Sequence, residues 1–316
     1  MKSLILLKNI DTSADIDNPL TIRESAKRFE TYIFEPDHLF LEDYIPYANA
    51  YKITNKKSGG FEVSKTITKI NLNDNCLVSI RLDPPFNNRY LTSLYILEKV
   101  GGKSYVTNSP VGIIRMPEKI LRPELKKFLP KTLISHDEKK ILDFWKKHKD
   151  IILKPLYEYG GKNVFRLKPQ EENYKSILNS LLSTYKEHIV AQEYIPEVKI
   201  GDKRITFIDG EVFTITLRKP AKGQLQASVS LGGSMHKSRL TENEKEICKI
   251  LKPILKENGI FFCAIDIIGK YLTEVNVTCP TIAYLANHTN CNDKDYVPSE
   301  KIYWDRLEKK LKTLNK

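Results

Sequence analysis

Residues 261–281, FFCAIDIIGKYLTEVNVTCPT, constrain the fold of this chain more than any other stretch. Two apolar runs flank a Gly-Lys pair, a pattern that predicts a largely buried β-hairpin. Asp266, Glu274 and Asn276 interrupt these runs. A buried charge costs several kcal/mol unless a partner compensates it. A bound cation with oxygen ligands would be such a partner, so the hairpin is a candidate metal site.

The metal hypothesis depends on how this hairpin pairs. Glu274 and Asn276 are two residues apart, so they share one face of a strand. A two-residue turn at Gly269-Lys270 would place Asp266 on the opposite face, whereas a three-residue loop or a β-bulge would bring all three oxygens together. Such oxygen ligands suit Mg²⁺, which commonly shares them with phosphate oxygens. The alternative is a half-exposed hairpin with ordinary surface acids.

The composition indicates a globular protein with room for two domains. The chain has 316 residues, of which 41% are hydrophobic and 28% charged. Its net charge is +12, from 51 Lys and Arg against 39 Asp and Glu, but the lysines are spread among acids along predicted helix faces. This distribution favours a solvated surface that attracts anionic substrates over a stripe that binds nucleic acid.

Cysteine usage and hydropathy bear on the compartment. Five cysteines without a CxxC pair argue against a disulfide framework and favour a reducing, cytoplasmic environment. The N-terminal MKSLILLKNID has too short an apolar run for a signal peptide. No stretch approaches the ~20 apolar residues that span a bilayer, so we expect no membrane association.

The N-terminal third alternates between strand and helix patterns. Strands are predicted at 3–7 and 76–80, helices at 21–29 and 88–100, and a further strand with a turn at 103–110. Such alternation favours a parallel sheet with helices on its faces. Residues 55–64 are expected to form an exposed loop or hairpin.

From about residue 117 the pattern changes to an antiparallel α+β arrangement. Two helices open with predicted capping boxes, Ser135 with Glu138 and Thr241 with Glu244, and the second helix stops at Gly259. Asp209-Gly210 predicts a tight hairpin turn within 204–217. The remaining elements are strands at 150–156 and 188–195, a glycine turn leading into a strand at 159–165, and a C-terminal helix at 299–314.

Lysine, glycine and arginine positions indicate where anions would bind. Lys154 ends a predicted strand just before Gly160-Gly161, and glycines let backbone N–H groups approach a phosphate. A plain hairpin turn is the alternative. Arg204 and Arg218 flank the predicted hairpin and could bind carboxylates bidentately, although arginines at such positions commonly lie on the surface.

The motif RLDPPF, residues 81–86, follows a hydrophobic strand at a position where α/β folds place ligand-binding loops. Its two prolines would stiffen the loop and orient Arg81 and Asp83. A structural proline turn explains the motif equally well. The six histidines show no ligand spacing, and no arrangement typical of nucleophilic catalysis stands out.

In this order, RLDPPF, FWKKHKDIILKPL, YIPEVKIGDKRI, DGE and LKENGIFFCAIDIIGKYLTEVNVTCPT resemble the prokaryotic-type glutathione synthetases of the ATP-grasp superfamily. The resemblance implies an α/β plus α+β architecture: a Rossmann-like (pre-ATP-grasp), substrate-binding domain at 1–118 and an ATP-grasp domain at 119–316. It implies an ATP-dependent carbon–nitrogen ligase that joins γ-glutamylcysteine and glycine into glutathione through an acyl phosphate. The implied partners are ATP, both substrates and Mg²⁺ or Mn²⁺, in a cytoplasmic homo-oligomer that binds neither nucleic acid nor membrane.

The resemblance also implies roles for individual residues. The metal ligands would be Asp266, Glu274 and Asn276. The nucleotide would contact Lys119, Lys154, Gly160, Gly161, Glu193, Tyr194, Ile195 and Asp202. The dipeptide would face Arg81, Asp83, Arg204 and Arg218, the last two acting in catalysis.

The chain departs from the family pattern in several places. Gln226 and Ser228 stand where the family has Arg and Asn, and losing one donor to a developing oxyanion commonly costs ~10²–10³ in rate. Glu158 replaces a flexible glycine in the glycine loop, and KNI and IDNPLT replace family elements at 8–10 and 16–21. Two alternatives therefore stay open: an ATP-grasp ligase with another acyl or amine substrate, and a degenerate ATP-binding regulator.

Overall fold

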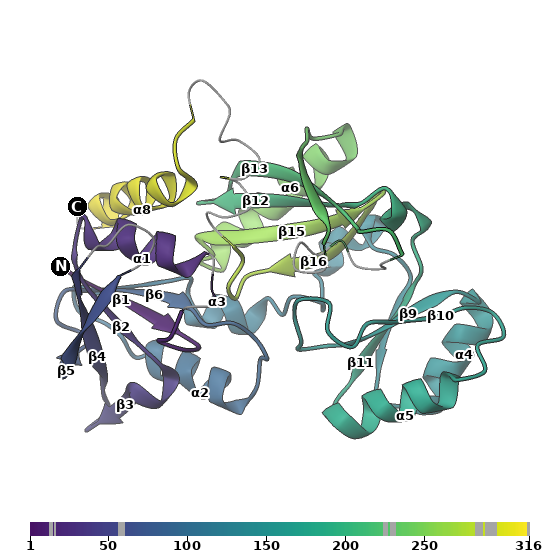
Figure 1. The fold of residues 1–316 in the computed structure, drawn as a ribbon, viewed down its shortest axis with the longest axis horizontal. Helices are drawn as coiled ribbons and strands as arrows, with labels where there is room; N and C mark the ends of the chain where they lie inside the picture. Colours follow the sequence, from purple (N-terminus) through teal and green to yellow (C-terminus); the bar gives the residue numbers. More distant parts are fainter. Residues whose placement is uncertain are drawn as a thin grey trace.

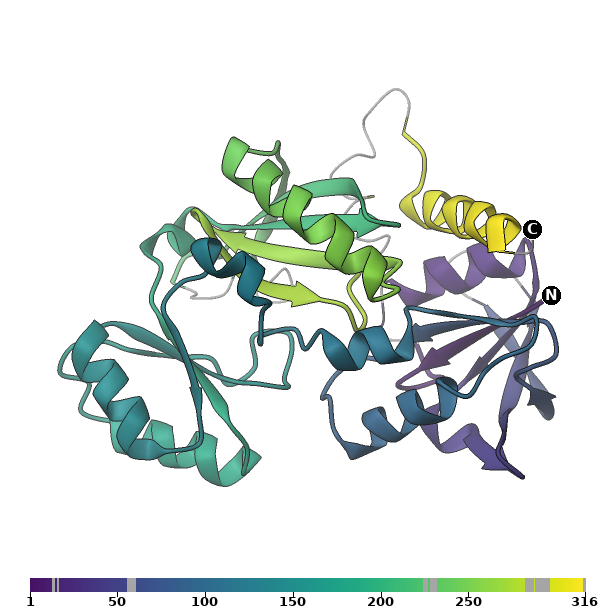
Figure 2. The same cartoon turned by 180° about the vertical axis from the view of Figure 1, so that it is seen from behind.

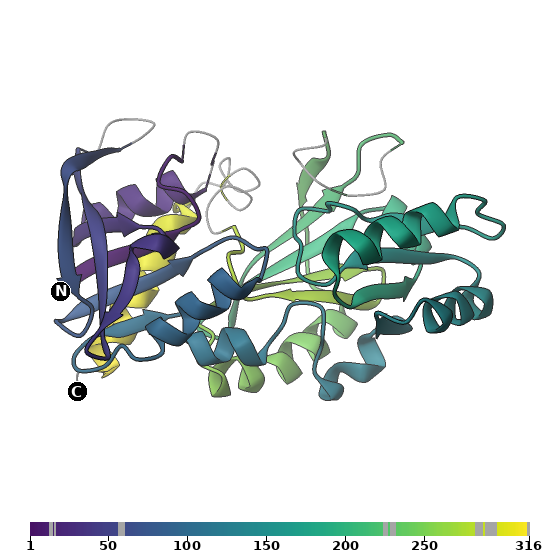
Figure 3. The same cartoon turned by 90° about the horizontal axis from the view of Figure 1, so that it is seen from below.

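Strands form three sheets in the part of the chain that the computed structural model describes: residues 1–12, 15, 17–55, 61–223, 227, 232–281, 287 and 296–314. The N-terminal sheet lies at one end of the molecule, and the other two sheets lie beyond it toward the other end, the sheet within residues 202–276 nearer the middle (Figures 1 and 3). The two ends of the chain lie close together, at the end of the molecule that carries the N-terminal sheet (Figure 2). Among the described residues, no helix is long and apolar enough to cross a membrane.

The first sheet is parallel at its centre, as the alternating pattern predicts. β1 (Lys2–Leu7) lies between β2 (Glu30–Phe34) and β6 (Cys76–Arg81), and β7 (Tyr105–Thr107) extends the sheet beside β6. Every residue of β6 is buried, as expected for a parallel strand covered on both faces. α1 (Asn18–Ala26) begins three residues earlier than predicted and ends at Ala26.

An antiparallel extension of this sheet was not predicted. β3 (Leu39–Glu42), β4 (Ile45–Asn55) and β5 (Glu62–Asn71) pair antiparallel beyond β2. Most of β5 is exposed, so its sequence lacks the clean apolar alternation that marks a half-buried strand. Of the predicted loop or hairpin at 55–64, residues 56–60 lie outside the described residues, and Glu62–Ser64 belong to β5.

Helices cover both faces of the first sheet. α2 (Asn88–Leu97) packs with α3 (Pro110–Arg115) on the face that carries Leu4, and α1 and α8 (Ser299–Leu314) cover the other face (Figure 1). Trp304 of α8 is fully buried, and its Nε1 donates to the carbonyl of Thr21 at 3.0 Å. The C-terminal helix therefore packs on the N-terminal sheet, and the domain boundary between residues 118 and 119 remains a prediction.

The second sheet is antiparallel, in the order β10 (Phe165–Leu167), β9 (Ile151–Pro155), β11 (Ile189–Glu193) and β8 (Thr132–Ser135). α4 (Glu138–His148) and α5 (Tyr174–Tyr185) pack on the face that carries Leu153 and Ala191. The capping box predicted at Ser135 and Glu138 is wrong. Ser135 ends β8, and Asp137 caps α4 by accepting from the Lys140 N–H at 3.2 Å.

The third sheet has the order β14 (Ser234–Lys237), β13 (Glu211–Lys219), β12 (Asp202–Ile208), β15 (Phe262–Ile268) and β16 (Tyr271–Asn276). α6 (Glu242–Glu257) covers one of its faces (Figure 2). The capping box of Thr241 and Glu244 is confirmed, as is the tight turn at Asp209-Gly210, where φ is 53° and 77°. Lys203 of β12 forms an ion pair with Glu244 of α6. The side chain of the next residue, Arg204, therefore points to the opposite face of the sheet, away from α6.

Short 3₁₀ helices complete the described chain. They are η1 (Pro36–His38), η2 (Pro123–Phe128) and η3 (Pro196–Lys199).

Candidate active site

A cavity of about 460 Å³ lies between the helix-free faces of the second and third sheets. Successive side chains of a strand point to opposite faces of the sheet. The residues next to those that pack under the helices therefore point into the cavity. Of the predicted site residues, only Arg81 and Lys119 are outside its lining. The predicted residues that line it are Asp83, Lys154, Gly160, Gly161, Glu193, Tyr194, Ile195, Asp202, Arg204, Arg218, Asp266, Glu274 and Asn276.

A β-bulge aligns the three candidate metal ligands. Asp266 pairs with Glu274 and Ala264 with Asn276, but Ile267 already pairs with Leu272, so Thr273 is the extra residue. The turn itself keeps only two residues, Gly269 and Lys270. The bulge that the hypothesis requires is therefore present, and all three side chains share one sheet face.

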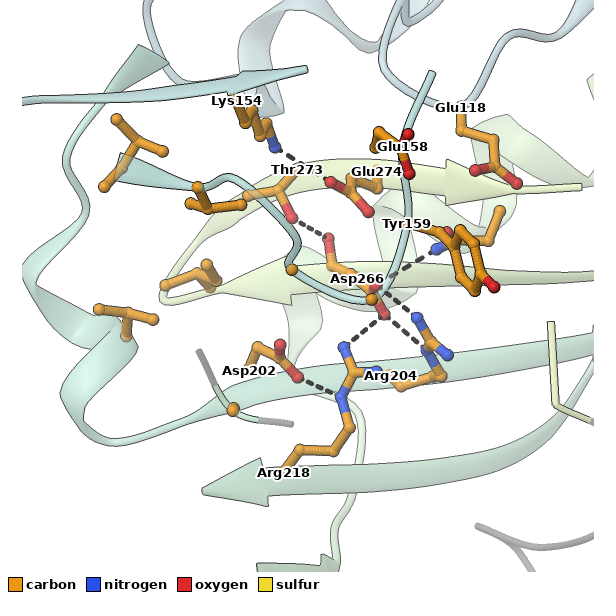
Figure 4. A pocket seen from close by; sticks show the side chains of 18 of the residues that line it. Glu118, Lys154, Glu158, Tyr159, Asp202, Arg204, Arg218, Asp266, Thr273 and Glu274 are labelled. Atoms are coloured by element: carbon orange, nitrogen blue, oxygen red, sulfur yellow. Dashed lines mark hydrogen bonds and ion pairs between the residues drawn. The ribbon is translucent and has the colours of Figure 1, made fainter. Parts of the chain in front are cut away.

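The carboxylate of Asp266 sits in a network of arginines (Figure 4). Arg204 binds it bidentately, through Nε to Oδ1 at 2.8 Å and Nη2 to Oδ2 at 2.7 Å. Arg218 reaches Oδ1 at 3.0 Å and donates through Nε to Asp202. Burial alone would raise the pKa of Asp266, but these two guanidiniums hold the pKa well below its ordinary value.

Glu274 pairs with a different cation. Lys154 Nζ donates to its Oε1 at 3.1 Å, and the Glu274 side chain is 25% exposed. Burial would raise the pKa of Glu274, whereas the charges of Lys154 and Lys119 lower it below its ordinary value. Both candidate carboxylates are thus held in the ionised form that a cation requires.

The donor set fits a hard divalent cation. Two carboxylates and one side-chain amide line the cavity from one sheet face, and carboxylate and amide oxygens are the ligands that Mg²⁺ and Mn²⁺ prefer. The described residues contain no group of three His, Cys, Asp or Glu side chains that could hold a metal ion, and the third donor of this candidate set is the amide of Asn276. Oε2 of Glu274 meets no donor among the described residues.

The glycine loop after β9 is fixed by a lysine predicted to bind phosphate. Lys119 Nζ donates to the carbonyls of Leu156 at 3.1 Å and Glu158 at 2.5 Å. Gly160 and Gly161 have φ of 67° and 74°, values that disfavour other residues. Lys119 therefore lies next to the cavity but contacts the loop backbone rather than the open space.

Arg81 lies buried beside the cavity. It is 4% exposed, and its guanidinium donates to Asn18 Oδ1, Asp17 Oδ2 and the carbonyl of Pro280 at 2.7–2.9 Å. It thus ties α1 to the chain after β16. Its predicted neighbour Asp83 does line the cavity, and burial raises the pKa of this carboxyl group.

An apolar pocket adjoins the strand β11. Ile152, Tyr194, Ile195 and Val198 line the cavity there, next to Gln192 and Glu193. Arg166 covers the Tyr194 ring, with the guanidinium carbon 3.4 Å from the ring centroid. Apolar side chains combined with a few polar groups at a strand end are typical of a pocket for a small molecule.

Sequence reasoning missed several lining residues. Glu118 accepts from the N–H and hydroxyl of Thr278 at 3.2 Å and 2.7 Å, and burial raises its pKa. Cys279 follows on the same loop, and burial raises the pKa of its thiol well above its ordinary value. The available signal was position alone: Glu118 precedes a lysine predicted to bind phosphate, and Thr278 lies two residues after the candidate metal strand. Gln226 and Ser228 lie outside the described residues.

Two family models cover nearly the whole chain. The model of the prokaryotic glutathione synthetase N-terminal domain matches residues 3–114, and that of the ATP-grasp domain of the same enzymes matches residues 118–290. The chain belongs to the prokaryotic glutathione synthetase family. Members of this family are ATP-grasp ligases that use ATP and a divalent metal, so the expected enzyme class is confirmed.

Individual relatives support this membership. A glutathione synthetase of Agrobacterium fabrum is 34% identical over 306 residues, covering 96% of this chain and 94% of the relative. One of Buchnera aphidicola subsp. Schizaphis graminum is 36% identical over 276 residues, covering 86% of each.

Solved structures share the fold. The D-cycloserine synthetase DcsG superposes with a TM-score of 0.67 at 13% identity, covering 98% of this chain and 99% of that one. D-alanyl-alanine synthetase A from Vibrio cholerae gives 0.62 at 10% identity, covering 98% of both chains. The predicted ATP-grasp architecture is therefore confirmed.

Proposed function

We propose that this chain joins γ-glutamylcysteine to glycine. ATP transfers its terminal phosphoryl group to the cysteinyl carboxylate, and the glycine amine then displaces phosphate from the acyl phosphate. The products are glutathione, ADP and phosphate. The observation that carries the proposal is the single cavity in which paired carboxylates, two arginines, a lysine and a glycine loop meet an apolar pocket.

We assign the nucleotide to the space between the second and third sheets. The pocket around Glu193, Tyr194 and Ile195 would take the adenine, since backbone groups at a strand end can read its edge while apolar side chains cover its faces. Lys154 and the Gly160-Gly161 loop would hold the phosphates through a point charge and backbone N–H groups. Lys119 would position that loop, because it binds two of the loop carbonyls.

We assign a Mg²⁺ or Mn²⁺ ion to Asp266, Glu274 and Asn276. When bound, such an ion neutralises charge on the transferring phosphoryl group. The protein's own contribution is placement, because β15 and β16 hold the three donors on one rigid sheet face.

Arg204 and Arg218 are the groups we expect at the reacting carboxylate. Their guanidiniums lie on neighbouring strands at the floor of the cavity, so they can stabilise charge that develops on the acyl group. Asp83 lines the opposite, N-terminal side, where it could accept from a substrate ammonium group. No strong general base is required, because catalysis of phosphoryl transfer rests mainly on positioning and charge neutralisation.

A second candidate is a related ATP-grasp ligase with another carboxylate or amine. The observation in its favour is that Glu158, which departs from the family pattern within the glycine loop, lines the cavity. An extra carboxylate there would alter which amine acceptor the cavity accepts, or how the nucleotide lies in it.

We also propose a homo-oligomer in the cytoplasm. The family resemblance supports the oligomer, and four free cysteines among the described residues, Cys76, Cys248, Cys263 and Cys279, support a reducing compartment. Light scattering during gel filtration tests the oligomer, and a mass equal to one chain would contradict it.

The deciding experiment measures ADP release from ATP and Mg²⁺ with γ-glutamylcysteine plus glycine, omitting each substrate in turn, with mass detection of the product. We expect release to require both substrates and glutathione to form. ATP binding by calorimetry without turnover on these substrates would overturn the proposal and direct the search to the second candidate.

A further inference from the structure

Asp266 differs from Glu274 in how completely its carboxylate is occupied. Its side chain is 8% exposed, and four donors reach it: Arg204 twice, Arg218 once, and Asn276 Nδ2 at 3.2 Å from Oδ2. A carboxylate offers about four lone-pair sites, so Asp266 has no oxygen left for another ligand. Glu274, in contrast, binds one lysine through one oxygen.

The charges around Asp266 form a row across four adjacent strands. Arg218 of β13 lies opposite Asp202 of β12, Arg204 of β12 lies opposite Asp266 of β15, and Asp266 lies opposite Glu274 of β16. With Lys154, three cationic side chains face three anionic ones, so the row is balanced (Figure 4). A divalent cation that enters alone would unbalance it and would be repelled by both guanidiniums.

We propose that Arg204 and Arg218 keep Asp266 closed to a divalent cation until an oxyanion of the substrates draws the two guanidiniums away. This inference rests on the metal site assigned above. A carboxylate or phosphoryl oxygen is the natural competitor, because arginine binds both with the fork geometry it uses on Asp266. Its source is either the dipeptide carboxylate or the terminal phosphate of ATP.

Asp202 has a part in this exchange as a positioning residue. It holds Arg218 through Nε while the Nη2 of the same guanidinium contacts Asp266. When Arg218 leaves Asp266, Asp202 of β12 still holds the Nε of Arg218 beside the cavity. The guanidinium can then turn toward an incoming oxyanion without leaving the site.

The consequence is reciprocal coupling between metal and oxyanion. An oxyanion on the arginines frees Asp266 and so raises metal affinity, and the metal must raise oxyanion affinity by the same factor. Couplings between sites commonly lie in the range of about 5- to 150-fold. We expect at least a tenfold effect, since two guanidiniums are involved.

The test counts Mn²⁺ bound to the intact protein by electron paramagnetic resonance. Three conditions are compared: Mn²⁺ alone, Mn²⁺ with γ-glutamyl-α-aminobutyrate, which carries the dipeptide carboxylate without its thiol, and Mn²⁺ with a non-hydrolysable ATP analogue already saturated with Mn²⁺. We expect Mn²⁺ affinity to rise about tenfold or more with at least one oxyanion, and the condition that raises it identifies the source. Equal Mn²⁺ affinity in all three conditions overturns the inference, and this comparison uses the wild-type protein alone.

Variants separate this inference from the metal assignment. Arg218→Gln should raise Mn²⁺ affinity in the absence of oxyanion and reduce the effect of adding one, whereas Lys219→Gln, which removes an exposed charge from the same strand, should change neither. If Arg218→Gln leaves Mn²⁺ affinity unchanged, the closing role of the arginine is wrong. If Glu274→Gln retains full Mn²⁺ binding in every condition, the metal assignment itself has failed.

Discussion

Asp266 and Glu274 lie directly opposite each other across β15 and β16 because Thr273 forms a one-residue bulge between Glu274 and Leu272. In a regular ladder with the same two-residue turn, Thr273 would occupy the position opposite Asp266, and Glu274 would face the other side. The bulge also lets the Thr273 hydroxyl donate to the carbonyl of Asp266 at 3.0 Å. A single extra residue thus creates the paired carboxylates of the candidate active site.

Glu274→Gln should abolish turnover while leaving the fold intact. The substitution keeps the shape of the side chain but removes one anionic ligand, and we expect kcat to fall by at least ~10² because charge stabilisation at the phosphoryl group is lost. Steady-state kinetics with Mg²⁺ and a thermal melt measure the two effects. Glu211→Gln, at an exposed hairpin turn, is the matched control. Undiminished activity in Glu274→Gln would exclude this residue as a metal ligand.

Asp266→Asn should lower the free energy of unfolding and make that free energy less dependent on pH in acid. Removing the anion leaves two largely buried guanidiniums without their main partner, a change that typically costs about 3–5 kcal/mol.

The pH dependence follows from the lowered pKa of Asp266 in the folded state. In the unfolded chain this group binds a proton near its ordinary value of 3.8, so the native state gains stability above that pH and loses it as pH falls from about 5 toward 2. Urea unfolding over this range should show a smaller loss for Asp266→Asn than for the wild type. Parallel pH profiles would mean that Asp266 is not the group responsible.

Gly160→Ala should weaken ATP binding more than it lowers stability. Gly160 has φ of 67° and no heavy atom within 4 Å of an added Cβ, so the cost is backbone strain of about 1–2 kcal/mol rather than a clash. We expect KM for ATP to rise several-fold. Gly223→Ala is a closely matched control, since Gly223 has φ of 82°, an equally open surrounding and no part in the cavity. Equal effects of both variants on KM would show that the glycine loop does not contact the nucleotide.

Gln226→Arg should raise the rate of acyl transfer if the residue is a simple loss from the family pattern. A restored guanidinium would stabilise the developing oxyanion, an effect of up to ~10²-fold in rate. Single-turnover kinetics of acyl transfer measure it, with Ser228→Asn as the companion variant. A fall in rate would indicate that the pocket has been rebuilt around glutamine.

Local sequence signals predicted the elements that depend on local chemistry. The Asp209-Gly210 turn, the capping box of Thr241 and Glu244, and the strands around Asp266 were all recovered, because each needs only a few neighbouring residues. The β4–β5 hairpin was missed, since its exposed outer strand shows little apolar alternation. The capping box predicted at Ser135 is wrong because Ser135 belongs to the preceding strand β8, and Asp137 is an equally good N-cap for α4.

The sequence by itself therefore determined the order of elements, the ATP-grasp family and the set of polar residues placed on buried strands. Only the tertiary structure decided which of these residues meet. Arg204 and Asp266 are 62 positions apart, and Lys154 and Glu274 are 120 apart, yet each pair is in direct contact. It likewise decided that Arg81 is buried against Asn18 and Pro280 rather than facing the cavity. The physical reason is that strand register and sheet packing set these distances, and both arise from burial of the whole core rather than from any local pattern.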